Sequence, residues 1–262
     1  NGNWKNLMQQ KNSSADISPT AGQMPRLLGL AQASKIFRNV PGLENFTNFS
    51  NQGNEVAWGT IGNASSSEGL FFETINAAGV LQVPMVMSVW DDEYGISVHA
   101  RHQTTKENIS EILKGFQRDA DTKGYEIFTV NGWDYPTLVE TYQKAAAIAR
   151  EEHVPVLIHV QQLTQPQGHS TSGSHERYKN ADRLAWEADF DCLTQMRTWL
   201  LKNNIASENE LDSIDEISKN LVLEGKKAAW TAFVSPMKEE QKELVALLNS
   251  IANTSSNQVF IQ

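Results

Sequence analysis

Apolar positions follow two different spacings along the first two thirds of the chain. Short apolar runs between polar or glycine residues predict strands, whereas apolar residues three or four positions apart predict helices. Strands are expected at 55–61, 84–90, 125–130 and 154–160, and helices at 22–38, 68–81, 104–122 and 134–152. Apolar strands that alternate with helices predict an α/β fold, in which a parallel sheet is flanked by helices. Such sheets bind ligands at the carboxyl ends of their strands.

The alternation stops at residues 162–182, which are rich in Gln, Ser, Thr, Gly and His and show no period. A long irregular segment in a compact domain is either functional or disordered. Helices are expected again at 187–203, 207–233 and 236–252, and Pro236 suits the first position of the last one, after Ser235 as its N-cap. We therefore predict an α/β domain over 1–182 and a C-terminal helical extension over 183–262, packed on that domain or on a partner.

Composition and charge narrow the functional classes. The chain has 262 residues, of which 40% are apolar and 20% charged, which suits one large globular domain. Its net charge of -9 argues against nucleic acid or an anionic membrane as the main partner, and no apolar run is long enough for a membrane helix. The single cysteine, Cys192, rules out an internal disulfide and suits a reducing compartment. The polar first residues are not a signal peptide, and because the chain does not begin with Met we interpret it as a fragment, or as a mature or trimmed product.

Oxygen-bearing side chains follow two successive predicted strands. The segment 62–69 joins the first strand to a helix, and its small residues allow a phosphate to approach the backbone at the helix start. Asp92 comes after the next strand. Magnesium prefers oxygen ligands and binds through one or two side chains together with substrate phosphates. Asn63, Asp92 and a carbonyl near Tyr94 could bind it, although an ordinary strand-to-helix turn and a solvated acidic turn would have the same spacing.

Segment 62–98, GNASSSEGLFFETINAAGVLQVPMVMSVWDDEYGISV, resembles the bipartite motif of thiamine-diphosphate enzymes, which opens with Gly-Asp-Gly and closes with Asn-Asn. It is most similar to the α subunit of the branched-chain and pyruvate-type 2-oxoacid dehydrogenase complexes. Ser18–Pro25 resembles the family's segment beside the aminopyrimidine ring, and Gly168–Ser172 resembles its phosphate-facing loop. The tail from Asp191 to Pro236 resembles the family's C-terminal helices. Three motifs in the family's order argue against chance similarity.

The resemblance implies a site for thiamine diphosphate and Mg²⁺. The implied metal ligands are Asn63, Asp92 and the carbonyl of Tyr94. The implied cofactor-binding residues are Ser18, Thr20, Gly62, Asn63, Ala64, Ser65, Glu68, Gln165 and His169, with His169 also the catalytic residue. Glu68 equally suits a helix N-terminus, and His169 without the resemblance would be interpreted as an exposed loop histidine.

Four departures from the family pattern affect this site. The family's acidic ligand is replaced by Asn63 and its second Asn by Asp92, so carboxylate and amide have exchanged places and the summed charge is unchanged. We expect this site still to bind metal. Gln165 stands where many relatives have an Arg, and it keeps a donor but loses the charged fork. Gly173 replaces an Asp in the loop, and Gly22 replaces a potassium-binding Thr, so no potassium ion is expected.

The resemblance implies a component that decarboxylates a 2-oxo acid and passes the acyl group to a lipoyl-bearing acyltransferase. The cofactor supplies the bond-breaking chemistry, and the protein binds and orients it. No pyrimidine-binding domain is recognised in the chain, so we expect a β-like subunit or segment to complete the site, in a homodimer or an α2β2-like assembly. The alternatives are another thiamine-diphosphate enzyme, transketolase-like or acetoin-cleaving, and a non-catalytic domain that has lost its cofactor. The expected compartment is the cytoplasm, or the mitochondrial matrix in a eukaryote.

Other side chains are assigned to packing or to the surface. His159, in an apolar strand, is expected in the core, and Asp91 is expected to turn away from the site. His99 and His102 are candidates for facing the cleft, whereas His153 and His175 are expected at the surface. Cys192 is expected to be a buried small hydrophobe. Ser170 and Ser172 are expected to be plain loop serines, with phosphorylation as the alternative. The tryptophans expected to fill the core and interfaces are Trp58, Trp90, Trp133, Trp186, Trp199 and Trp230.

Overall fold

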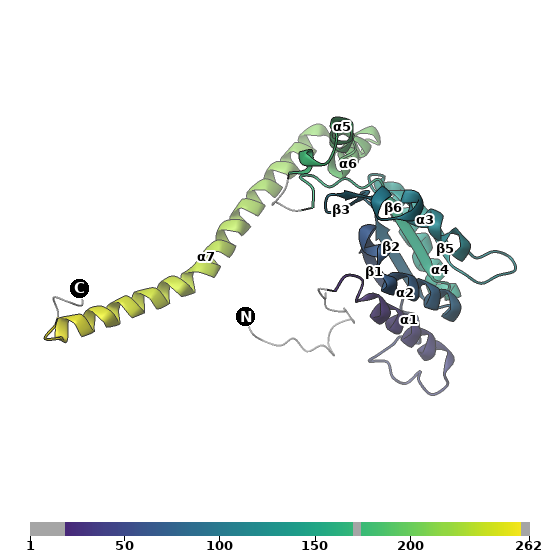
Figure 1. Ribbon diagram of the computed structural model, residues 1–262, viewed down its shortest axis with the longest axis horizontal. Helices are drawn as coiled ribbons and strands as arrows, with labels where there is room; N and C mark the ends of the chain where they lie inside the picture. Colours follow the sequence, from purple (N-terminus) through teal and green to yellow (C-terminus); the bar gives the residue numbers. More distant parts are fainter. Residues whose placement is uncertain (1–18, 170–173, 258–262) are drawn as a thin grey trace. The chain divides into compact units, whose positions relative to one another are not determined.

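The computed structural model describes residues 19–169 and 174–257 of the chain (Figure 1). The chain divides into two compact units, Asn1–Thr198 and Trp199–Gln262. The boundary expected near residue 182 stays a prediction. Within the described residues, no helix is both long enough and apolar enough to cross a membrane.

A four-stranded parallel sheet forms the centre of the first unit. Its strands are β1 (Ala57–Gly62), β2 (Met85–Trp90), β5 (Glu126–Asn131) and β6 (Val156–Gln161), in the order β1-β2-β6-β5. Gly62 is in register with Trp90, and Trp90 with Val160, so these strands end at the same edge of the sheet. The predicted parallel α/β fold is confirmed, and each strand lies within two residues of its predicted bounds.

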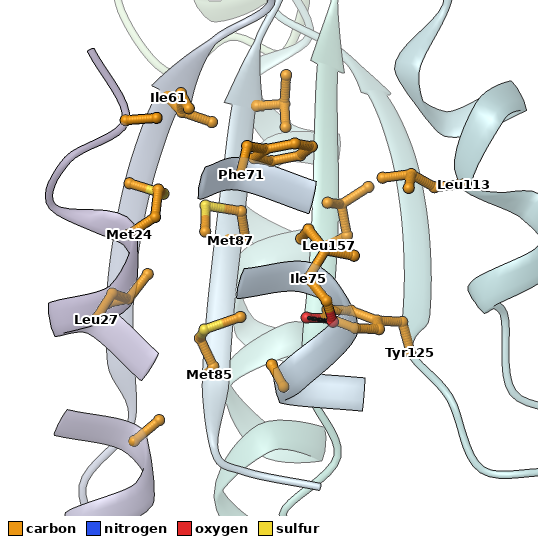
Figure 2. Close-up of a cluster of buried hydrophobic side chains, with 14 of the residues drawn as sticks. Met24, Leu27, Ile61, Phe71, Ile75, Met85, Met87, Leu113, Tyr125 and Leu157 are labelled. Atoms are coloured by element: carbon orange, nitrogen blue, oxygen red, sulfur yellow. Dashed lines mark hydrogen bonds between the residues drawn. The ribbon is translucent and has the colours of Figure 1, made fainter. Parts of the chain in front are cut away.

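Side chains of successive strand residues point to opposite sides of the sheet, so these apolar strands present apolar surface on both faces. Helices cover both faces. On one face, Met85, Met87 and Leu157 pack with α1 (Met24–Asn39) and α2 (Gly69–Leu81) (Figure 2). The residues of α2 that contribute to this core are Phe71, Ile75 and Ala78, at the spacing of one helix face. On the other face, α4 (Tyr135–Glu152) packs Ala145 and Ala149 against Val86, Val156, Ile158 and Val160.

Tyr125 is the largest side chain that is fully buried in this core. Its hydroxyl donates a hydrogen bond of 2.9 Å to the carbonyl oxygen of Ile75 in α2 (Figure 2). Burial raises the pKa of Tyr125 far above its usual range, so the side chain remains a neutral donor. The bond satisfies the one polar atom that this ring brings into the core.

The prediction of a single helix over 104–122 is wrong. The segment contains three short pieces, η4 (Thr105–Glu107), α3 (Ile109–Ile112) and η5 (Leu113–Phe116). Lys106 has a φ of 62°, which interrupts helical geometry, and Asn108 has an extended backbone. The Asn108 side chain accepts a hydrogen bond from the Glu111 N–H and caps a new helix. Local capping therefore overrides the apolar spacing.

The C-terminal helices also differ from expectation. The helix expected at 187–203 is two helices, α5 (Ala181–Asp189) and α6 (Cys192–Lys202), and the Asp191 carboxylate accepts from the Leu193 and Thr194 amides where α6 starts. The break expected at Ser235 and Pro236 is wrong, because α7 is continuous over Glu208–Thr254. A capping box between Ser207 and Glu210 starts this helix.

Several burial predictions need correction. Trp58, Trp90 and Trp230 are 44%, 51% and 67% exposed in the single chain, so they do not fill its core, and their expected place at interfaces stays a prediction. Trp58, in the edge strand β1, instead stacks on Tyr142 of α4, with ring centroids 5.9 Å apart. His153, which follows the end of α4, is buried rather than at the surface. His175 and Cys192 are half-buried. His159 is fully buried, as expected.

Candidate functional site

A cavity of about 700 Å³ lies at the carboxyl edge of the sheet. The ends of β1 and β2 and the segment that follows β6 contribute to its walls. Its lining residues are Thr20, Gly62, Asn63, Ala64, Ser65, Trp90, Asp92, Tyr94, Gly95, Ile96, Gln103, Leu163, Thr164, Gln165 and His169. The cavity therefore collects most of the residues singled out from the sequence. Glu68 is not among them, since it is exposed at the N-cap of α2, and Ser18 lies outside the described residues.

The first wall is the turn after β1. Asn63 is only 5% exposed, and its backbone N–H donates 3.0 Å to the Trp90 carbonyl at the end of β2. A 3-10 turn, η2 (Ala64–Ser67), separates this residue from α2, so η2 and not the first turn of α2 lines the cavity. A Cβ on Gly62 would meet only the Ser65 hydroxyl, at 4.0 Å. Space therefore remains above the Gly62 backbone.

The second wall is the turn after β2, residues 91–95. The Asp92 Oδ1 atom accepts a hydrogen bond of 3.1 Å from the Tyr94 N–H, which closes a short turn around Glu93, whose φ is 68°. Burial raises the pKa of Asp92 above its usual value, against the opposing effects of the Tyr94 N–H and the Lys179 charge. Asp91 does not line the cavity, because its carboxylate turns toward His159.

The donor set of these two walls fits a magnesium diphosphate. The Asn63 Nδ2 atom is buried and has no hydrogen-bond partner among the described residues, so its amide is free to bind a group in the cavity. Asp92 adds one carboxylate. Among the described residues, no group of three or more His, Cys, Asp or Glu side chains could hold a metal on its own. A metal that takes part of its ligands from phosphate oxygens needs no such group.

The third wall is the segment after β6, which carries Gln165 and His169. Gly168 has a φ of 77°, and the Tyr178 hydroxyl occupies the space that a side chain at this position would need. Burial raises the pKa of the Tyr178 hydroxyl, and a hydrogen bond with the His169 backbone opposes this shift. The Tyr178 ring also packs on Tyr94, at 5.5 Å between centroids. Tyr178 thus connects the His169 segment to the turn after β2. Ser170, Ser172 and Gly173 lie outside the described residues.

A cluster of charged side chains contacts the turn after β2, and two of them, Lys179 and Glu187, are buried. The Lys179 ammonium contacts both Glu187 carboxylate oxygens at 2.7 and 2.8 Å, and the Arg183 Nε contacts the same carboxylate at 2.8 Å. Arg183 also donates 2.9 Å to the Asp92 carbonyl and pairs with Glu93. Sequence inspection missed these residues, although Arg183 and Glu187 have the four-residue spacing of a helical ion pair.

His99 and His102 do not line the main cavity. They line a neighbouring cavity of about 560 Å³, which shares Tyr94 with the main one. The Arg101 Nε donates to the His102 Nε2 at 3.1 Å, and the His99 Nδ1 accepts from the Arg101 N–H.

The chain has sequence relatives among known proteins. The family model described as "Dehydrogenase E1 component" matches residues 2–236. The pyruvate dehydrogenase E1 component subunit alpha of Rickettsia bellii is 24% identical over 72% of this chain and 54% of its own length. The mitochondrial 2-oxoisovalerate dehydrogenase subunit alpha 1 of Arabidopsis thaliana is 25% identical over 89% of this chain and 44% of its own length. The chain thus spans about half the length of these relatives.

Among solved structures, a transketolase variant from Pichia stipitis covers 88% of this chain and 32% of its own, at 16% identity and a TM-score of 0.46. That score is too low to identify the fold, whereas the family model covers most of the sequence. The chain belongs to the dehydrogenase E1 component family.

Proposed function

We propose that this chain is the α-like part of a 2-oxoacid dehydrogenase and binds the diphosphate and Mg²⁺ of thiamine diphosphate. The observation that carries the proposal is the buried Asn63 amide, whose Nδ2 lacks a partner among the described residues and which lines one cavity with Asp92 and Tyr94. The names of relatives, pyruvate and 2-oxoisovalerate dehydrogenase α subunits, support the substrate class.

Asn63 Oδ1, the Asp92 carboxylate and the Tyr94 carbonyl would hold the metal, and diphosphate oxygens would complete its coordination. The space above Gly62 lets the diphosphate approach the backbone. Because the pKa of Asp92 is raised in the protein without metal, Mg²⁺ competes with a proton for this carboxylate. The ion therefore favours the charged form that burial alone disfavours.

Gln165 and His169 would contact the diphosphate from the third wall of the cavity. His169 is exposed, so it can reach a bound group without moving a covering side chain. Thr20 lines the same cavity, and we propose Ser18, which lies outside the described residues, as a further cofactor contact. Bound thiamine diphosphate supplies the nucleophilic carbon and the electron sink that decarboxylation requires. The chain's own residues would bind and orient its diphosphate end.

The remainder of the enzyme would complete the site. A β-like pyrimidine-binding subunit or segment would face the cavity, and an α2β2-like assembly or homodimer would bring it there. The exposed Trp90 and Ile96, both at the cavity, offer apolar surface for this contact. The 2-oxo acid would enter between the two parts, and the acyl group would leave on a lipoyl-bearing acyltransferase. We expect a cytoplasmic enzyme, or a matrix enzyme in a eukaryote, and an inactive isolated chain.

Calorimetry tests the proposal on the full-length protein assembled with its pyrimidine-binding partner. Thiamine diphosphate should bind saturably and only with Mg²⁺, and Asn63→Ala and His169→Ala should both weaken this binding. Asn39→Ala is the control, because Asn39 is exposed at the end of α1. Absence of binding in the assembled protein would contradict the proposal and favour a domain that has lost its cofactor. Decarboxylation without transfer to a lipoyl acceptor would favour another thiamine-diphosphate enzyme.

A further inference from the structure

We propose that His159 is a positioning residue, which fixes the turn after β2 so that Asp92 and the Tyr94 carbonyl meet the metal. This inference rests on the proposed function, since it concerns the same metal site. His159 lies within β6 and is fully buried, so it touches neither the cavity nor anything bound there. It acts through Asp91, the residue immediately before Asp92.

The link between His159 and the turn is a continuous set of short contacts. The His159 Nε2 atom lies 2.8 Å from Asp91 Oδ2. The other carboxylate oxygen, Asp91 Oδ1, accepts a hydrogen bond of 2.8 Å from the Glu93 N–H. This second bond closes the turn at Glu93, the residue with positive φ between Asp92 and Tyr94. One carboxylate thus joins the core of β6 to the backbone of the metal-binding turn.

The hydrogen bonds around His159 determine the charge of the buried Asp91–His159 pair. The Ser110 hydroxyl donates 2.8 Å to the Asn108 side-chain oxygen, which also accepts from the Glu111 N–H. Ser110 has one proton to donate, so it accepts from the His159 Nδ1–H, 2.9 Å away. The contact from Nε2 to Asp91 then contains one further proton, on either atom. In both cases the Asp91–His159 pair has no net charge.

Because the Asp91–His159 pair is neutral, the two adjacent aspartates have different roles. Asp91 is only 5% exposed and is compensated by His159, so it adds no net charge to the metal site. Asp92 is left as the one carboxylate of the turn that lines the cavity. Without His159, a buried Asp91 carboxylate would lose its partner, and an unpaired buried charge is strongly unfavourable. Asp91 would then turn toward water or the metal and release the Glu93 amide.

The expected consequence is weaker metal binding without loss of the chemistry. Groups that orient metal ligands without contacting the metal themselves typically contribute about 10- to 100-fold to metal affinity. In His159→Gln, the half-saturating Mg²⁺ concentration should rise by about this factor. The kcat at saturating Mg²⁺ should stay near that of the wild type. A purely structural role would instead reduce the amount of folded protein and would not shift the Mg²⁺ dependence of the folded fraction.

The double variant Asp91→Asn/His159→Gln tests the charge argument. It removes both charges and keeps two side chains that can hydrogen-bond across β2 and β6, so no buried charge is left unpaired. Its Mg²⁺ dependence should return to within about threefold of that of Asp91→Asn alone. His153→Gln is the matched control, because it replaces another buried histidine at the opposite end of β6, away from the cavity.

The measurement is the Mg²⁺ dependence of thiamine diphosphate binding and of activity in the assembled full-length protein. If the wild type shows no Mg²⁺-dependent binding, the proposed function fails and this inference fails with it. If the wild type binds and His159→Gln has an unchanged or lower half-saturating Mg²⁺ concentration, the inference alone is wrong. An increase in His159→Gln, with the double variant within about threefold of Asp91→Asn and with His153→Gln unchanged, would support it.

Discussion

Gly95 lies so close to Ala64 that a Cβ built on Gly95 would be 2.6 Å from the Ala64 Cβ. The two residues belong to the two halves of the motif, Ala64 to the turn after β1 and Gly95 to the turn after β2. This approach lets both turns line one cavity. A glycine is required at position 95 because of the neighbouring atoms and not because of its backbone angles, since its φ is not positive.

Gly95→Ala should therefore push the two turns apart. Gln103 could move away from the new methyl group, but the Ala64 Cβ is held by its own backbone. We expect a loss of about 1–3 kcal/mol in the free energy of unfolding, typical of an overpacked position. Mg²⁺-dependent cofactor binding should weaken by about tenfold or more. Denaturant unfolding and calorimetry measure the two effects.

Gly115→Ala is the matched control for this steric argument. Nothing lies within 4 Å of the position that its Cβ would take. Its unfolding free energy and its cofactor binding should match those of the wild type. Wild-type binding in Gly95→Ala would show that the two turns need not touch for the site to work.

The proposed exchange of metal ligands between Asn63 and Asp92 leads to a second prediction. Asp92→Asn removes the one carboxylate of these two walls that lines the cavity, so Mg²⁺-dependent binding should fall. A unit charge near a divalent ion contributes several kcal/mol, and a loss of about tenfold or more is expected. The double variant Asn63→Asp/Asp92→Asn restores the summed ligand charge and should recover binding. Calorimetry on all three proteins decides this, and unchanged binding in Asp92→Asn would contradict the ligand assignment.

The strands could be predicted from local sequence and most lining residues from the resemblance to a family, whereas the side chains that contact the turn after β2 from the core could not. β2 and β6 are apolar at almost every position because both faces are covered, and such runs are recognisable. Asn63 and Asp92 stand in a motif with fixed spacing. Arg183, by contrast, contacts Glu93 across 90 residues of chain, and His159 contacts Asp91 across 68. Neither contact leaves a local pattern, so the apolar strand predicts a core position for His159 but not its link to the site.

The pH dependence of stability should include a contribution from His153. Burial, followed by the Arg38 charge, lowers the pKa of His153 below 6.5. The unfolded chain therefore takes up this proton at a higher pH than the folded chain does. The stabilisation is present above pH 6.5 and is lost as the pH falls through the folded-state pKa.

His153→Gln should remove this contribution. Glutamine suits the position, since Gln82 ends α2 in the same left-handed conformation in which His153 ends α4. Denaturant unfolding on both sides of pH 6.5 should show a smaller drop in unfolding free energy for the variant than for the wild type. Equal drops in the two proteins would mean that His153 does not titrate differently on folding.

Pro236 within α7 gives the last prediction. Ser235 and Pro236 have the sequence pattern of a helix start, yet α7 continues through both residues from Glu208 to Thr254. A proline inside a helix removes one backbone donor and costs about 3 kcal/mol relative to alanine. Pro236→Ala should therefore raise helicity and thermal stability of α7, as measured by circular dichroism. Ser235→Ala distinguishes a helix that starts after Ser235 from a helix that continues through it. If Ser235 were an N-cap, the change would be destabilising by about 1 kcal/mol. In a continuous helix the change should stabilise slightly, because alanine is the better helix former.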